Sequence, residues 1–140
     1  MAPASFGRFG GDLIAPDELS GNVYAIAPSG RVAGVIASGL PHGQDIGVES
    51  AAFVPRSFTD ALVADRHTPG NPHPGDDLIL ALSRSALRAA GVRPGDLLVV
   101  SEGGAETIDV RCAAACRVSD IARGPQIAHI EGHVVFSGTI

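Results

Sequence analysis

The chain has 140 residues, with 15 acidic residues against 10 arginines, no lysine, and a formal net charge of −5. An acidic chain with neither a basic stripe nor interleaved aromatic residues is not expected to bind nucleic acid. No apolar run reaches the roughly 18 residues that a spanning helix needs, so a membrane is not an expected partner either.

The composition favours a protein of short strands and tight turns. Hydrophobic residues make up 45% of the chain but aromatics only 4%, so a core must be built from Val, Ile, Leu and Ala. The 18 Gly and 10 Pro are spread between the apolar runs, where they act as turn residues. We therefore expect one soluble β domain over residues 1–140. The lack of lysine is typical of a GC-rich bacterial genome.

The first predicted elements form a hairpin. Apolar segments predict strands over 12–15, 22–27 and 31–37, with a turn over 16–21. Pro28-Ser29-Gly30 separates the second strand from the third. Proline fixes φ and glycine accepts positive φ, so a tight turn is expected there.

The remainder of the chain continues the strand-and-turn pattern, with one interruption. Ser83 is a typical N-cap for a short helix over 84–90, which Gly91 would end. The polar, proline-rich stretch over 66–77 cannot be a strand. Further strands are predicted over 48–54, 61–65, 78–82, 96–101, 107–112, 117–121, 127–130 and 133–136.

Similar segments recur along the chain. A Gly-rich entry, an acidic residue, an apolar strand and a hairpin return about every 35 to 45 residues, which is near the period of a propeller blade. We divide the chain into blade-like repeats over 9–47, 48–95 and 96–140. The stretch from Leu13 to Val32 resembles the blade pattern of six-bladed propellers of the gluconolactonase and NHL-repeat kind. This resemblance implies an all-β fold of antiparallel blades, a partial β-propeller with one short helix near 83–90.

Three blades are too few to close a propeller, since closed propellers use about four to eight. The chain is then a part of a longer one, or assembles as a homo-oligomer, or has a different all-β fold.

The clearest candidate for a metal site is His129-Ile-Glu131-Gly-His133. Alternation in a strand places these three polar side chains on one face, and two imidazoles with a carboxylate can bind a divalent cation, zinc or calcium. A solvated strand face with hydrogen-bonded histidines is the alternative. Glu131-Gly132 also resembles the Glu-Gly at a blade entry in the gluconolactonase family, which implies a metal-ligand role for Glu131.

Other polar residues are candidates for binding. Glu49 opens an apolar strand, where it can coordinate a cation or accept backbone N–H groups. Asp65, His67 and His73 flank or lie in the long loop over 66–77 and can line a ligand pocket, or simply be solvated. Glu102 and Glu106 flank a Gly-rich turn, where exposed carboxylates have ordinary acidity.

Cys112 and Cys116 are expected to join the two strands of a tight hairpin. Three states remain open: reduced thiols, a disulfide, or metal ligands. A disulfide would indicate an exported protein.

No complete catalytic set is visible, so whether the chain is an enzyme stays open. We expect a propeller-like module that binds a small molecule or a protein. The alternative is a divalent-metal-dependent hydrolase of the lactonase type, in which the cation polarises a carbonyl or activates water. A purely structural β domain is the third possibility.

Overall fold

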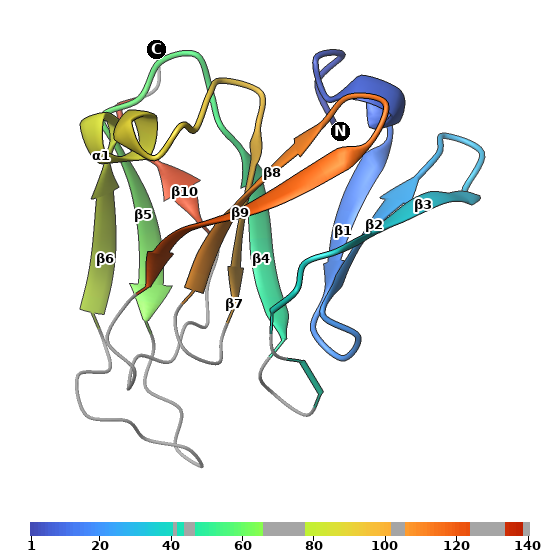
Figure 1. The fold of residues 1–140 in the computed structure, drawn as a ribbon, viewed down its shortest axis with the longest axis horizontal. Coiled ribbons are helices and arrows are strands. Elements are labelled where there is room, and N and C mark those ends of the chain that lie inside the picture. Colours follow the sequence, from blue (N-terminus) through green and yellow to red (C-terminus); the bar gives the residue numbers. More distant parts are fainter. Residues whose placement is uncertain (41, 44–46, 66–77, 102–105, 124–133, 139–140) are drawn as a thin grey trace.

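The structure is a computed structural model, and it describes residues 1–40, 42–43, 47–65, 78–101, 106–123 and 134–138 (Figure 1). Within these residues the chain forms β-strands, one short α-helix and one turn of 3₁₀ helix. The strands pair into three antiparallel sheets. The all-β class predicted from composition and turn spacing is therefore confirmed.

The first sheet is a meander of β1 (Leu13–Asp17), β2 (Asn22–Ile26) and β3 (Val32–Ala37). Gly30, in the turn between β2 and β3, has a φ of +83°, as the Pro-Ser-Gly sequence predicts. The turn predicted over 16–21 begins later than expected, because β1 continues through Pro16. Proline is tolerated there because β1 is an edge strand, which forms a hydrogen-bonded ladder on one side only.

The central sheet is assembled from strands that are far apart in the sequence. Its order is β4 (Val48–Phe53), β7 (Leu97–Ser101), β8 (Glu106–Cys112) and β9 (Cys116–Arg123). β4 pairs with β7 although a hairpin and a helix lie between them along the chain. This sheet therefore combines strands from the segments 48–95 and 96–140.

The third sheet has the order β10 (Val135–Phe136), β5 (Asp60–Asp65) and β6 (Leu78–Ser83). α1 (Arg84–Ala89) follows β6 directly, and the Ser83 hydroxyl accepts the Ala86 N–H at 3.2 Å. The predicted capped helix is thus confirmed, one residue shorter than expected. The strand predicted over 133–136 is found as β10, whereas the one predicted over 127–130 lies outside the described residues.

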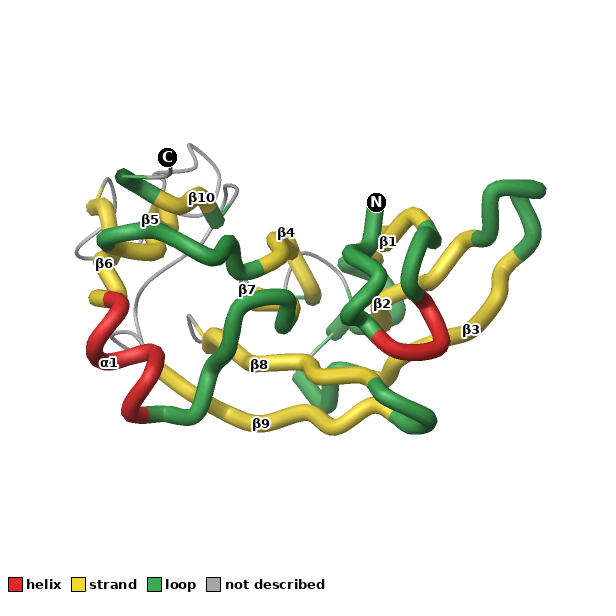
Figure 2. The backbone as a smooth tube through the Cα atoms, turned by 90° about the horizontal axis from the view of Figure 1, so that it is seen from above, coloured by secondary structure: helices red, strands yellow, loops and turns green. Residues whose placement is uncertain are grey.

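The sheets pack side by side through two hydrophobic cores, which share the central sheet (Figure 2). The first core lies between the first and central sheets and includes Val23, Ile36, Leu97 and Val99. The second core lies between the central and third sheets and includes Ala61, Val63, Leu87, Leu98 and Val100. Successive β7 residues therefore point into different cores, and every residue of β7 is buried.

The N-terminal segment closes the first core. Phe6 and Phe9, at the 3₁₀ turn η1 (Gly7–Phe9), are both buried. Phe6 contacts Phe53 edge to face, with 4.9 Å between the ring centroids. A Cβ on Gly34 of β3 would lie 2.5 Å from the Phe9 ring, so glycine is required for this contact.

One edge strand of each sheet lies along the same side of the molecule. β10, β4 and β1 follow the upper side of Figure 2, and α1, β8 and β9 follow the lower side. β1 also contacts β4. The division into blade-like repeats and their closure into a propeller stay predictions. No helix among the described residues is long and apolar enough to cross a bilayer.

Candidate functional site

Most of the polar residues predicted to bind lie outside the described part of the chain. Asp65 is the last residue of β5 and pairs with Leu78 of β6. Glu49 lies in β4, and its side chain is half-buried. The structure describes neither the predicted metal ligands His129, Glu131 and His133 nor the loop histidines His67 and His73.

Glu49 lies at an irregularity in the central sheet. The register of β4 against β7 shifts between Val48 and Ser50, so Glu49 has no Cα partner in β7. Such a bulge re-aims the side chains next to it. The adjacent Ser50 is buried, and its Oγ accepts the N–H of Val134 at 2.9 Å. This bond ties the start of β4 to the residue that precedes β10.

The described residues contain no cluster of three His, Cys, Asp or Glu side chains able to hold a metal ion. Metal binding through His129, Glu131, His133 and Glu49 therefore stays a prediction.

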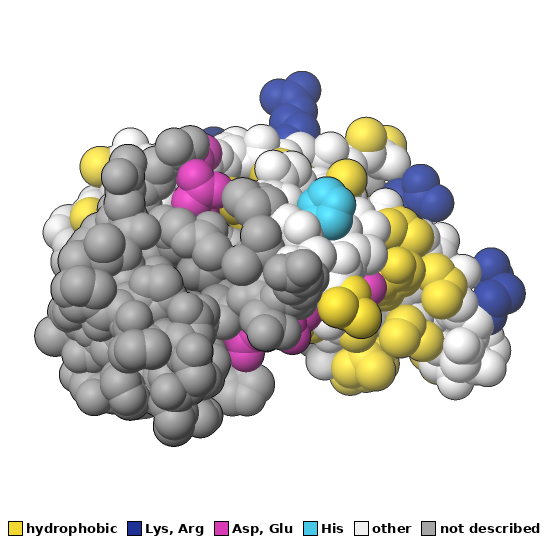
Figure 3. All heavy atoms as spheres, turned by 90° about the horizontal axis from the view of Figure 1, so that it is seen from below, with side chains coloured by type: hydrophobic (Ala, Val, Ile, Leu, Met, Phe, Trp, Pro, Cys, Tyr) yellow, Lys and Arg dark blue, Asp and Glu magenta, His cyan; other side chains and the backbone are white. Residues whose placement is uncertain are grey.

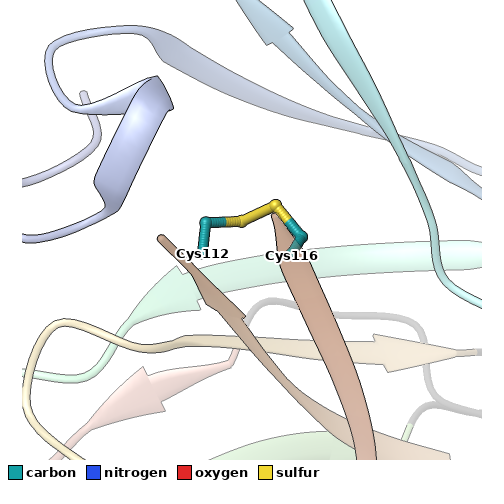
Figure 4. Close-up of a disulfide and its surroundings, with 2 residues drawn as sticks. All are labelled: Cys112 and Cys116. Carbon is teal, nitrogen blue, oxygen red and sulfur yellow. A yellow bond between two sulfur atoms is a disulfide. The ribbon is translucent and has the colours of Figure 1, made fainter. Parts of the chain in front are cut away.

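The two cysteines form a disulfide at the tip of the β8–β9 hairpin (Figure 4). Cys112 and Cys116 are paired residues at the end of the ladder, so the bond closes the hairpin as the sequence predicted. The tip also packs on η1, because the Arg8 N–H donates to the Ala113 carbonyl at 3.1 Å. Of the three states left open by the sequence, the disulfide is the one found.

A buried acidic pair holds the loop after α1 against the central sheet. Asp96 precedes β7 and Asp109 lies in β8, and both are buried. Arg111 donates from Nε to Asp96 Oδ1 at 3.0 Å and from Nη2 to the Gly91 carbonyl at 2.8 Å. Asp96 also accepts the Arg93 N–H at 2.8 Å. Arg111 thus joins β8 to the 91–96 loop.

Asp109 is the member of this pair with the less favourable environment. Its Oδ1 is buried and has no hydrogen-bond partner among the described residues. Burial, and next the charge of Asp96, raise the pKa of Asp109 from 3.8 to about 6, although Arg111 lowers it. A carboxyl that titrates near neutrality can transfer protons. Its contacts here are with structural groups, however, so we interpret the pair as part of the scaffold.

A shallow cleft of about 630 Å³, largely open to solvent, lies where α1 meets the start of β5. Phe58 is among the lining residues, is buried, and contacts Phe136 edge to face, with 5.0 Å between the ring centroids. The cleft lining includes Thr59 and Asp60, which are fixed by backbone hydrogen bonds to Ser137 of 2.8 and 2.9 Å, and the Arg84 N–H donates to the Thr59 carbonyl at 2.9 Å. The rest of the lining comes from α1 and its cap: Ser83, Arg84, Ser85 and Arg88.

The α1 wall carries two arginines one helical turn apart, so they share a face of the helix. Arg84 is held in place: its Nη2 donates to the Arg56 carbonyl at 3.1 Å, and its guanidinium lies 5.6 Å from the Phe58 ring centroid. Arg88 is exposed, and no described carboxylate forms an ion pair with it. The cleft therefore offers a fixed cation, an available cation, hydroxyl groups and the Asp60 carboxylate.

Comparisons with protein-family models, with curated proteins and with solved structures found no match to this chain.

Sequence reasoning missed both the cleft and the acidic pair. The spacing of Arg84 and Arg88 on a capped helix was a usable signal for the first. The rest of the lining, Thr59 and Asp60, lies at the start of β5, which pairs with the end of β6 just before α1. For the acidic pair, the usable signal was Asp109. A charged residue between Ile108 and Val110 in an apolar strand is a sign of a buried carboxylate.

The raised pKa of Asp109 predicts a specific pH dependence of stability. The unfolded carboxyl titrates near 3.8 and the folded one near 6. The folded state is therefore favoured most below pH 4, and this contribution is lost as the pH rises through 6. A shift of about two pH units corresponds to at most about 3 kcal/mol. Asp109→Asn removes the charge, so at pH 7.5 we expect its free energy of unfolding to exceed that of the wild type by about 1–3 kcal/mol.

Urea unfolding of both proteins at pH 4.0 and pH 7.5 measures this difference, and it should nearly vanish at pH 4.0. Because only the difference between the two proteins is used, titration of the other carboxylates cancels. A variant that is equally destabilised at both pH values would contradict the proposed ionisation.

Proposed function

We propose that this chain is a ligand-binding module built of blade-like β-sheets, and that it takes a small hydroxylated anion in the cleft between α1 and β5. The observation that carries the proposal is the exposed Arg88, which faces the cleft beside the fixed Arg84. Cavities of roughly 300–1,000 Å³ with an apolar base and a few polar groups are typical of small-molecule sites.

The charges and hydroxyls of the cleft define the ligand class. Arginine binds carboxylate and phosphate groups, often through two parallel hydrogen bonds. The Asp60 carboxylate is a hydrogen-bond acceptor only, so it would bind hydroxyl groups of a ligand. The hydroxyls of Ser83, Ser85 and Thr59 can each donate or accept a hydrogen bond. A ligand with an anionic group at one end and hydroxyls along its length satisfies both walls.

The disulfide supports a proposal about location. Disulfides persist in oxidising compartments and are rare where thiols are kept reduced. We propose that the module works outside the reducing cytosol. The sequence analysis expected an exported protein if these two cysteines formed a disulfide.

Calorimetric titration with gluconate, a hydroxylated carboxylate, tests the cleft. We expect measurable binding by the wild type and at least a tenfold weaker affinity for Arg88→Gln, because a hydrogen bond to a charged group contributes about 1.5–3 kcal/mol. Sorbitol, the neutral analogue, should give no heat. Arg93→Gln is the matched control, since Arg93 is exposed and does not line the cleft.

Equal binding of gluconate by the wild type and Arg88→Gln would contradict the proposal. Binding of sorbitol as tight as that of gluconate would contradict it too, because the arginines would then have no role.

A second function, metal-dependent hydrolysis, is favoured by one hydrogen bond. Val134 directly follows His133 in the sequence, and its N–H bonds to Ser50, which directly follows Glu49. Glu49 and His133 are thus each one residue along the chain from the same contact. This supports the proposal that Glu49 joins His129, Glu131 and His133 in holding a divalent cation.

The metal proposal predicts that Glu131→Gln loses cation binding while the protein stays folded. Glutamine keeps the shape of the side chain but lacks the charge that holds a divalent ion. Titration of wild type and variant with zinc and with calcium measures the loss, and Glu18→Gln, in the β1–β2 turn, is the control. Equal heats for wild type and Glu131→Gln, or none from either, would rule out this site.

A further inference from the structure

A second hollow, of about 800 Å³, is open at the surface beside the N-terminal segment. We call it the proline groove, because Pro3, Pro55 and Pro94 all line it. Its lining comes from three segments that the fold brings together: the N-terminal residues, the end of β4 with the turn after it, and the loop before β7. Arg56 lines the groove, is exposed, and carries the one charged side chain among the described lining residues.

The lining of the proline groove is fixed by contacts between its segments. The Gly95 N–H donates to the Val54 carbonyl at 2.8 Å, and the Val54 N–H donates to the Asp96 carbonyl at 2.8 Å. The N-terminal segment is anchored beside them by the edge-to-face contact of Phe6 with Phe53. Proline also fixes φ at three of the lining positions. A site that is rigid before binding loses little conformational entropy when a ligand occupies it.

One hydrogen bond connects the proline groove with the cleft at α1. Arg84 lines the cleft, and its Nη2 donates to the backbone carbonyl of Arg56, which lines the groove, at 3.1 Å. The segment over residues 53–60 contributes to both hollows, with residues 53–56 in the groove and residues 58–60 in the cleft. The two hollows are therefore neighbours, and a ligand that fills one can extend into the other.

The charges of the molecule differ between the two ends of its strands. Both hollows lie at the end where β4 stops and β5 begins, which is the upper end in Figure 1. There Arg56, Arg84 and Arg88 form no ion pair with a described carboxylate, whereas Asp96 is already paired with Arg111. Figure 3 views the opposite end, where acidic side chains are visible. The described acidic residues towards that end are Asp17, Glu18, Glu49, Asp65 and Glu106. The end with the two hollows therefore attracts anions, although the whole chain is acidic.

We propose that the cleft and the proline groove together bind an acidic oligosaccharide, a chain of linked uronic acids. One carboxylate of this chain pairs with Arg88 in the cleft, and another pairs with Arg56 in the groove. The inference rests on the anion-binding function proposed above for the cleft. It adds the class of ligand, which is a segment of a polymer rather than a single hydroxylated acid.

The chemistry of the two linings favours linked uronic acids over other polyanions. Each unit carries a carboxylate, which a guanidinium binds through paired hydrogen bonds, and hydroxyls, which can donate to Asp60. The C–H face of each sugar ring can pack on the proline rings, where apolar surface leaves water. An acidic polypeptide has carboxylates without these ring hydroxyls.

Nucleic acid fits the two hollows less well. Single strands bind through aromatic side chains on which their bases stack. Phe53 and Phe58 are the aromatic residues of the described linings, but Phe58 is buried and Phe53 packs against Phe6. Neither offers an open ring face as a stacking platform.

Calorimetric titration with galacturonate and with tetragalacturonate tests the proposal. The tetramer should bind at least tenfold more tightly than the monomer, because once one carboxylate is bound the next meets Arg56 at a high effective concentration. Arg88→Gln should weaken the binding of both ligands. Arg56→Gln should weaken tetramer binding at least fivefold more than monomer binding, because it removes the cation from the groove but keeps the backbone carbonyl that accepts Arg84.

Arg31→Gln is the matched control, since Arg31 is exposed in the β2–β3 turn and lines neither hollow. It should bind both ligands like the wild type, and circular dichroism checks that each variant is folded. A tetramer that binds no more tightly than the monomer, or equally well to the wild type and Arg56→Gln, overturns the proposal. Tetraglutamate or a thymidine oligonucleotide that binds as tightly as tetragalacturonate also overturns it, because the site would then recognise charge alone or a nucleic acid.

The same titrations separate this inference from the function proposed for the cleft. Monomer binding that depends on Arg88, with no gain for the tetramer, supports the small-anion cleft and refutes its extension into the proline groove. Tetramer binding that depends on both Arg56 and Arg88, with no measurable binding of the monomer, supports the extended site and refutes the single-unit ligand. Absence of binding by either ligand overturns both.

Discussion

The structure depends on the burial of β7 on both of its faces. Leu97 and Val99 point into the first core, and Leu98 and Val100 point into the second. Each of the four is at most 1% exposed, so one short strand contributes to both cores. Full burial of a Val or Leu side chain contributes about 1.5–3 kcal/mol, and here those contributions hold three sheets together. Among the described residues, both the first and the third sheet pack on this strand through their cores.

This arrangement explains where surface is left for binding. The central sheet is covered on both faces, but the outer sheets are each covered on one face by a described core. The cleft forms at the junction where α1 leaves the third sheet and passes back to β7. The Arg111–Asp96 contact fixes that connection on the central sheet, so the cleft wall on α1 is anchored to the same scaffold. Scaffold and cleft are therefore linked through the loop at 91–96.

Local sequence signals predicted local structure well. The Pro-Ser-Gly turn, the Ser83 cap and the Gly91 helix end each depend on residues a few positions apart, and each was found. The strand predicted over 96–101 was also found, and its unbroken apolar run Leu97–Val100 is a further signal of burial on both faces that the sequence analysis did not use. Strand pairing was not predictable in the same way. Nothing in the sequence near Val48 indicates that β4 pairs with β7 rather than with β5, since that choice depends on how the cores fill.

Hydrogen exchange of the backbone amides, followed by NMR, tests the central role of β7 most directly. Amides in a doubly covered central strand exchange only when the whole structure opens, whereas edge strands also exchange through local opening. The amides of Leu98 and Val100 should therefore exchange slowest, with the free energy of global unfolding, and those of β1, β3 and β6 should exchange faster. If amides of the first or third sheet were protected more strongly than those of β7, the central sheet would not be the element on which the fold depends.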